Sequence, residues 1–199
     1  MIRMLVRAPH GAEFAADAVR ITASLSIFVA VFLFPAIDVL TVAAGAFATL
    51  VPRALGVRAA LDIALGIVIP VAAWSAVLEL YESTGWWDLP VHFAMNGLLA
   101  ALVYVLLTRF RLIPDADDLE RPTASGVVLV GMIGLSLGVL WELAEWFIRE
   151  YVDPDTFVGY TDTLGDLVAG GLGSIVAGFL VHYLAGNRRD RPDAQKGGP

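Results

Sequence analysis

Long apolar runs separated by short polar segments are the feature that most limits what this chain can fold into. The sequence of 199 residues is 58% hydrophobic and only 17% charged, and ordinary soluble domains contain fewer apolar and more charged residues. A helix needs about 20 apolar residues to cross the hydrocarbon core of a bilayer, and several runs approach that length. The sequence therefore predicts an all-α, polytopic membrane protein.

The apolar runs are best divided into six transmembrane helices. The first run is interrupted by Pro35, which cannot continue a helix. Read as one helix at about 1.5 Å per residue, that run would be about 50 Å long and would exceed a bilayer crossing. We therefore place a tight turn at Pro35, and the predicted spans cover residues 15–34, 36–51, 59–81, 89–108, 123–148 and 163–184.

Glycines are frequent in the last two predicted spans. Small residues let membrane helices approach one another closely, so we expect these spans to pack through their glycines. The residues concerned are Gly126, Gly131, Gly134 and Gly138 in the fifth span, and Gly165, Gly170, Gly171, Gly173 and Gly178 in the sixth.

The chain leaves no room for a second globular domain. We predict a single transmembrane domain over residues 1–186 and a polar, disordered cytoplasmic tail over residues 187–199. The first apolar run lacks a small-residue cleavage site after a short apolar core, so we expect it to be retained rather than removed as a signal peptide.

The basic residues are distributed unevenly around the six spans. Twelve of the thirteen lysines and arginines fall on one side of the predicted bundle, and Arg149 alone falls on the other. The positive-inside rule makes the richer side cytoplasmic. This predicts a multi-pass protein of the cell (inner) membrane with both termini in the cytoplasm. Four of the five tryptophans would form an aromatic belt near the opposite face: Trp86, Trp87, Trp141 and Trp146.

Composition excludes several classes of function. The absence of cysteine rules out disulfides, thiolate catalysis and iron–sulfur clusters. The only lysine, Lys196, lies in the predicted tail, which rules out a retinal Schiff base in the bundle. The net charge of -7 argues against a nucleic-acid partner.

Polar residues gather at the predicted extracytoplasmic ends of the last three spans. Ionisable groups are expensive near lipid and usually serve a function there. Residues at i, i+4 and i+8 share one helix face, and those one turn apart lie side by side. The residues are Asp88, His92 and Asn96 in the fourth span, Glu142 and Glu145 in the fifth, and Asp162 and Asp166 at the start of the sixth.

Ordinary structural roles would account for some of these residues. Asp88 fits a helix N-cap, and Thr163 with Asp166 fits a capping box. Hydrogen bonds to a neighbouring helix would explain His92. The glutamates fit a structural role least well, because the helix dipole disfavours acids near a C-terminus, although an ion-pair network with Arg149 stays open.

Two chemical roles are open to the same residues. Carboxylates and an imidazole can hold a divalent metal ion, which activates water or binds phosphate; alternatively, these groups could exchange protons as in transporters. The cofactor therefore stays open at this stage, with a divalent metal ion as the candidate. The predicted assignments are Asp88, His92, Glu142, Glu145 and Asp166 as metal ligands, Glu142, Glu145 and His92 as catalytic groups, and Asn96, Asp162 and Trp141 as substrate-binding residues.

Three segments carry a resemblance to a known family: Trp87-Asp-Leu-Pro-Val-His92, Trp141-Glu-Leu-Ala-Glu-Trp146 and Gly159-Tyr-Thr-Asp-Thr-Leu-Gly-Asp166. In these segments the chain resembles the YjdF-like family of small bacterial inner-membrane proteins, which is defined by a domain of unknown function. The order of the motifs is also similar to that of VanZ-like proteins, which are linked to glycopeptide tolerance. The chain departs from the VanZ-like pattern in having Glu145 in place of a glutamine, and a glycine in place of an asparagine after Asp166. The resemblance implies a fold and a site but no particular activity.

We therefore expect a site that opens to the extracytoplasmic leaflet and acts on a lipid-linked or envelope substrate, with membrane lipid around it. Two alternatives stay open, namely a small proton- or ion-coupled transporter or channel, and a non-catalytic assembly factor. Whether the protein is an enzyme is not decided at this stage. A transporter would need polar groups in the cytoplasmic half as well, and the sequence offers only Asp62 there.

Overall fold

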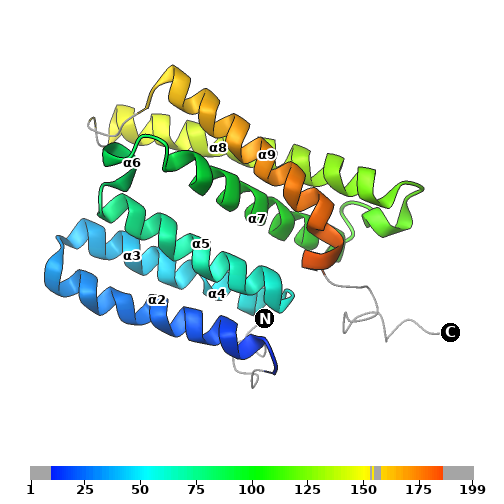
Figure 1. Ribbon diagram of the computed structural model, residues 1–199, viewed down its shortest axis with the longest axis horizontal. Coiled ribbons are helices and arrows are strands. Elements are labelled where there is room, and N and C mark those ends of the chain that lie inside the picture. The colour runs from blue at the N-terminus through cyan, green and yellow to red at the C-terminus, as the bar shows by residue number, and fades with distance from the viewer. Residues whose placement is uncertain (1–9, 153, 155–157, 186–199) are drawn as a thin grey trace.

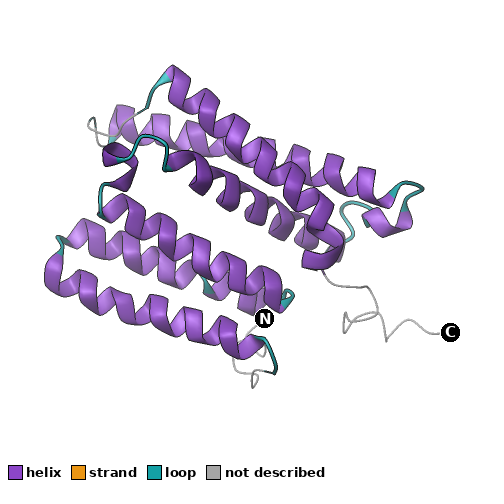
Figure 2. Ribbon diagram, in the orientation of Figure 1, coloured by secondary structure: helices purple, strands orange, loops and turns teal. Residues whose placement is uncertain are grey.

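The computed structural model describes residues 10–152, 154 and 158–185. The N-terminal arm and the predicted tail over residues 187–199 lie outside these ranges. Within them the chain is helical and contains no strand (Figure 2).

Six helical segments are long and apolar enough to cross a membrane, which confirms the predicted fold class. They are α2 (Glu13–Leu33), α3 (Ala36–Ala48) continued by α4 (Leu50–Leu55), α5 (Ala59–Val77), α7 (Asp88–Arg109), α8 (Pro122–Tyr151) and α9 (Tyr160–Ala185). A short helix, α6 (Leu80–Ser83), precedes α7, and a 3-10 turn, η1 (Ala116–Asp118), precedes α8.

The predicted spans agree closely with these helices except at the ends of the second and third. The second is predicted to end at residue 51, but α4 continues it to Leu55. Pro35 is the extended residue that precedes α3, so the chain reverses there as expected. The third span, however, ends at Val77 instead of residue 81, because Glu79 adopts a left-handed conformation with φ 53°. The predicted span runs past this break because Leu78, Leu80 and Tyr81 flank Glu79.

Helix α6 folds back against α5 and leads into α7. The Tyr81 hydroxyl donates a hydrogen bond of 3.1 Å to the Ala72 carbonyl. Burial raises the pKa of Tyr81 to about 12, so this hydroxyl keeps its proton. The Trp87 indole N–H donates to the Ser75 hydroxyl over 2.8 Å. These two bonds attach α6 and the residue before α7 to α5.

The spans form two groups of three helices (Figure 1). Helices α2, α3–α4 and α5 pack together in one group, and α7, α8 and α9 in the other, with α5 packed against α7. Successive spans run in opposite directions, so the loops alternate between the two ends of the molecule (Figure 1).

Glycines bring α9 into close contact with α7 and α8. A Cβ atom added at Gly173 would lie 1.9 Å from the Phe93 carbonyl oxygen of α7, and one at Gly178 would lie 2.6 Å from the Val127 Cα of α8. The predicted glycine packing of the last two spans is thus confirmed. It also extends to α7, where a Cβ at Gly97 would lie 2.6 Å from the Gly173 carbonyl oxygen.

The loop between α7 and α8 is anchored to the bundle. The Tyr104 hydroxyl donates to Asp115 over 3.0 Å and accepts the Ala116 backbone N–H over 2.8 Å. On the other side of the loop, Asp117 lies 2.6 Å from the ring of His182 on α9. These contacts hold the loop against α7 and α9 at the end of the group where α7 finishes.

A buried ion-pair network joins α2, α4 and α5. Arg20 pairs with Asp62 at 2.6 Å and with Asp17, and Arg53 lies 3.2 Å from Glu13 and 3.8 Å from Asp17. Arg20 and Arg53 are only 6% and 7% exposed. The prediction counted both arginines among the cations of the cytoplasmic side, which stays a prediction. It was wrong in naming Asp62 as the only polar group of that half, because Arg20, Arg53, Asp17 and Glu13 form a network with it.

Candidate functional site

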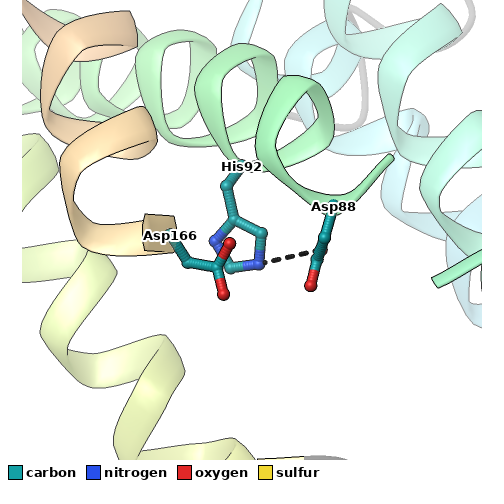
Figure 3. Close-up of side chains that lie close together, drawn as sticks. All are labelled: Asp88, His92 and Asp166. Carbon is teal, nitrogen blue, oxygen red and sulfur yellow. Dashed lines mark ion pairs between the residues drawn. The ribbon is translucent and has the colours of Figure 1, made fainter. Parts of the chain in front are cut away.

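The site begins on the first two turns of α7. Asp88 is the first residue of this helix, and His92 follows one turn later on the same face. The His92 Nε2 atom lies 3.3 Å from Asp88 Oδ1. Asp166 of α9 faces them, and Figure 3 shows the His92 ring between the two carboxylates. One ligand atom from each residue lies within 4.8 Å of the others, an arrangement suited to a metal ion.

Asn96 extends the site by one more turn of α7. Its side chain fits where α8 and α9 each have a glycine, because a Cβ at Gly170 would lie 2.1 Å, and one at Gly138 3.2 Å, from Asn96 Nδ2. Asn96 is 5% exposed, so the amide sits where the three helices meet. A residue larger than glycine at position 170 would displace it.

The two carboxylates of this group do not act as helix caps. Helix α7 begins at Asp88 itself, with no side-chain hydrogen bond at its cap residue Trp87. Helix α9 begins at Tyr160, so Thr163 and Asp166 lie inside the helix rather than at its start. The capping interpretations are therefore wrong. Helix capping does not explain why acids stand at these positions.

Glu142 of α8 is buried beside this group. It is 8% exposed, and neither of its carboxylate oxygens has a hydrogen-bond partner. The Thr163 hydroxyl lies near this carboxylate as a hydrogen-bond donor, although the contact falls short of full hydrogen-bond geometry. The alternative of an ion-pair network with Arg149 is not supported, because Arg149 donates to the Val158 carbonyl and is found in no ion pair with Glu142 or Glu145, all three residues being described.

Glu145 and Trp141 form a connected pair at the edge of the site. The Trp141 indole N–H donates to Glu145 Oε1 over 2.7 Å. The indole also meets the His92 ring edge to face, with ring centroids 6.3 Å apart and planes at 86°. Trp141 is 49% exposed, so one side of its ring contacts the site and the other faces outward.

The predicted set of five metal ligands divides in the structure. Asp88, His92 and Asp166 come together, whereas Glu142 and Glu145 lie beside them and outside the group. Asp162 is half-buried one turn before Asp166, within electrostatic reach of Asp88 and His92. All seven predicted polar residues thus belong to one end of the α7–α8–α9 group.

Unsatisfied polar atoms single out this part of the molecule. Among the described residues, four buried side-chain atoms lack a hydrogen-bond partner, and all four belong to the site. They are Asn96 Nδ2, Glu142 Oε1, Glu142 Oε2 and Asp166 Oδ2. Burying a carboxylate without a partner is expensive, and such atoms in folded proteins mark positions that an ion, a ligand or water satisfies. The donor set, rich in oxygen with one imidazole, suits a divalent cation.

The fold and the site together define a polytopic membrane protein with an acidic and histidine-containing group at one end of a three-helix half. The chain belongs to the family described as "Predicted membrane protein (DUF2238)", whose family model matches residues 19–187.

A protein of Thermotoga maritima with the printed name "Uncharacterized protein" is similar to this chain. The two are 33% identical over 107 residues, which cover 53% of this chain and 52% of the Thermotoga protein. The chain thus spans about half the length of this curated relative. No solved structure matches the chain.

Proposed function

We propose that the protein holds a divalent metal ion between α7 and α9, with Asp88, His92 and Asp166 as its ligands, and acts on a lipid-linked or envelope substrate at the membrane surface. The observation that carries this proposal is the convergence of the three ligand atoms within 4.8 Å, next to buried carboxylate oxygens that have no partner. Such an ion would supply Lewis acidity toward a phosphoryl or carbonyl oxygen.

The remaining residues have distinct roles in this proposal. Glu142 and Glu145 are the acid/base groups, since they lie beside the ligand group without joining it. Asn96 would donate from its buried amide to the substrate, and Trp141 and Asp162 would contact it at the rim. The YjdF-like name and the VanZ-like order of motifs stay predictions.

The interior of the α7–α8–α9 group favours a one-sided site over an ion pathway. One turn beyond Asn96 the three helices meet in an apolar core that includes Ala100, Val130, Ala177 and Val181. This core separates the site from Tyr104 and the loop at the other end. The charged network of α2, α4 and α5 belongs to the other helix group, and the arginines there pair with the acids.

An assembly role without a ligand is less consistent with the site. Charges that only lock a bundle would be expected to pair with one another, as Arg20 and Asp62 do at 2.6 Å. Glu142 and Asp166 instead keep buried oxygens without hydrogen bonds. That arrangement costs stability unless something binds there.

Metal content provides the direct test of this proposal. We expect protein purified in detergent to retain or take up a divalent ion, tested with Mg²⁺, Mn²⁺ and Zn²⁺. Because a carboxamide is neutral and binds a divalent ion less strongly than a carboxylate, Asp166→Asn should weaken binding by about 100-fold or more, beyond the 10–100-fold typical of outer-shell partners. Metal analysis and titration calorimetry measure both quantities.

Glu82→Gln is the matched control for this experiment. Glu82 is an exposed acid at the same end of the molecule, so its substitution should leave metal binding unchanged. Wild-type protein that neither retains nor binds any of the three ions would overturn the metal proposal.

We also propose that the protein is a multi-pass protein of the cell (inner) membrane with both termini in the cytoplasm, so that the site faces away from the cytoplasm. The arginine asymmetry supports this orientation. In a chain without cysteine, Glu82→Cys and Glu120→Cys place one thiol each at opposite ends of the molecule, both at exposed positions. An impermeant maleimide should label residue 82 in intact cells, and residue 120 only after permeabilisation. The reverse pattern would place the site on the cytoplasmic side.

A further inference from the structure

Trp141 separates the ligand group from the outer surface of α8. On one side its indole meets the His92 ring edge to face, with 6.3 Å between the ring centroids. The other side is open, since the residue is 49% exposed. By contrast, His92 and Asp166 are buried. At this point a single aromatic ring stands between a proposed metal ligand and whatever surrounds the helix.

The surface beside Trp141 is apolar. Residues three and seven positions further along a helix lie on the same side of it, and in α8 these are Ala144 and Ile148. Both are exposed, as is the neighbouring Leu140. Helix α8 is long and apolar enough to cross a membrane, and acyl chains are as apolar as such side chains. The exposed side of Trp141 is therefore suited to contact with lipid.

The depth of the site matches the boundary between headgroups and acyl chains. Helix α7 has 22 residues, and at about 1.5 Å per residue its length is close to the hydrocarbon thickness of about 30 Å. Its first residue, Asp88, therefore lies near that boundary, and His92 lies about 6 Å deeper. Exposed aromatic residues at the same end, which are typical of a membrane interface, support this placement. They are Trp86, Trp146, Tyr151 and Tyr160.

We infer that the substrate is a membrane phospholipid whose headgroup enters the site sideways, between α7 and α8 and past Trp141. This inference rests on the proposed function, which supplies the metal ion that the phosphate would meet. A phospholipid already holds its phosphate near the depth of His92, so sideways entry moves no acyl chain through water. The Trp141 indole N–H donates to Glu145 of the same helix over 2.7 Å. The ring can therefore turn aside without breaking a hydrogen bond between helices.

A route from water to the ligand group is also present. Asp88 is partly exposed at the start of α7, so ions and water can reach the group from that end. A soluble substrate would have to use this route and pass the headgroup layer. The experiments below therefore compare a lipid with its own soluble headgroup.

Tryptophan fluorescence tests whether Trp141 lies between lipid and the metal ion. In phosphatidylglycerol nanodiscs, we expect its emission to be quenched from one side by bound Mn²⁺ and from the other by lipids brominated near the headgroup. Trp141→Phe keeps an aromatic ring and should remove both effects. Trp146→Phe is the matched control, because Trp146 is equally exposed on α8 but contacts Tyr151 instead of His92. This variant should keep the quenching by Mn²⁺.

Occupancy by lipid can be measured at the metal ion itself. Mn²⁺-loaded protein in phosphatidylglycerol nanodiscs should show electron–nuclear coupling to ³¹P, because a bound headgroup brings its phosphorus beside the ion. Asp166→Asn should lose this signal, which excludes Mn²⁺ bound to lipid alone. Protein in dodecyl maltoside, a detergent without phosphorus, should show no coupling. Excess sn-glycerol 3-phosphate, the soluble part of the same lipid, should restore at most a small part of it.

The outcomes separate this inference from the proposed function. Equal ³¹P coupling with glycerol phosphate in detergent would show that the substrate comes from water, and would leave the metal site in place. Bound Mn²⁺ without ³¹P coupling in nanodiscs would rule out a phospholipid as the ligand. Quenching of Trp141 by acrylamide but not by brominated lipid would contradict the sideways route. Failure to bind any divalent ion would overturn the proposed function itself, and it is seen before lipid is added.

Discussion

Replacing Arg20 by methionine should destabilise the protein more than any other single change to a charged residue outside the site. The guanidinium group pairs with Asp62 at 2.6 Å, and both side chains are less than a tenth exposed. Methionine keeps much of the volume of arginine but leaves the Asp62 carboxylate buried without its partner. Breaking a buried ion pair in this way costs about 3–5 kcal/mol. Unfolding in detergent by heat or denaturant measures the loss.

Two further variants separate the ion pair from simple loss of volume. Arg121→Met removes an exposed arginine and should change stability by less than about 0.5 kcal/mol. Arg20→Met combined with Asp62→Leu removes both charges and should recover most of the loss, because an apolar pair can replace a buried ion pair at little cost. An Arg20→Met protein as stable as the wild type would show that the network does not support the fold.

Gly173→Ala is expected to separate α7 from α9 and to disrupt the site with the fold. The added Cβ would lie 1.9 Å from the Phe93 carbonyl oxygen. This oxygen belongs to the backbone of α7 and cannot rotate away, so the helices must move apart. Overpacking of this kind costs about 1–3 kcal/mol and at times more, and we expect the upper end of that range. Metal affinity should fall as well, because His92 and Asp166 lie on the two displaced helices.

Gly131→Ala is the matched control, since it changes a glycine of the same bundle with room to spare. Its Cβ would meet only Ile175 Cγ1 at 3.8 Å, an ordinary contact. Alanine favours helix over glycine by about 0.8–1.0 kcal/mol, so this variant should be as stable as the wild type or slightly more stable. Equal melting temperatures for Gly173→Ala and Gly131→Ala would rule out the close α7–α9 packing as a source of stability.

The end of the bundle that carries the site could be predicted from residue spacing alone. Asp88, His92 and Asn96 recur along one face of a helix, and that regularity holds whatever the helix packs against. The antiparallel order of the spans then brings the starts of α7 and α9 to the same end as the last turns of α8 (Figure 1). Which carboxylates come together around one point depends on the rotation of each helix about its own axis. The spacing of residues within a helix does not contain that information.

By itself, the sequence determined that the chain is a six-span helical membrane protein, because the length of an apolar run and the proline at position 35 are local properties. The sequence also determined that α9 packs through glycines. Only the tertiary structure decided that Arg20 and Asp62 form a buried pair, since 42 residues separate them in the chain. It also decided that Asp166 joins Asp88 and His92 while Glu142 stays beside them. Both outcomes follow from contacts between helices, and such contacts depend on the rotation and separation of whole elements rather than on any local pattern of residues.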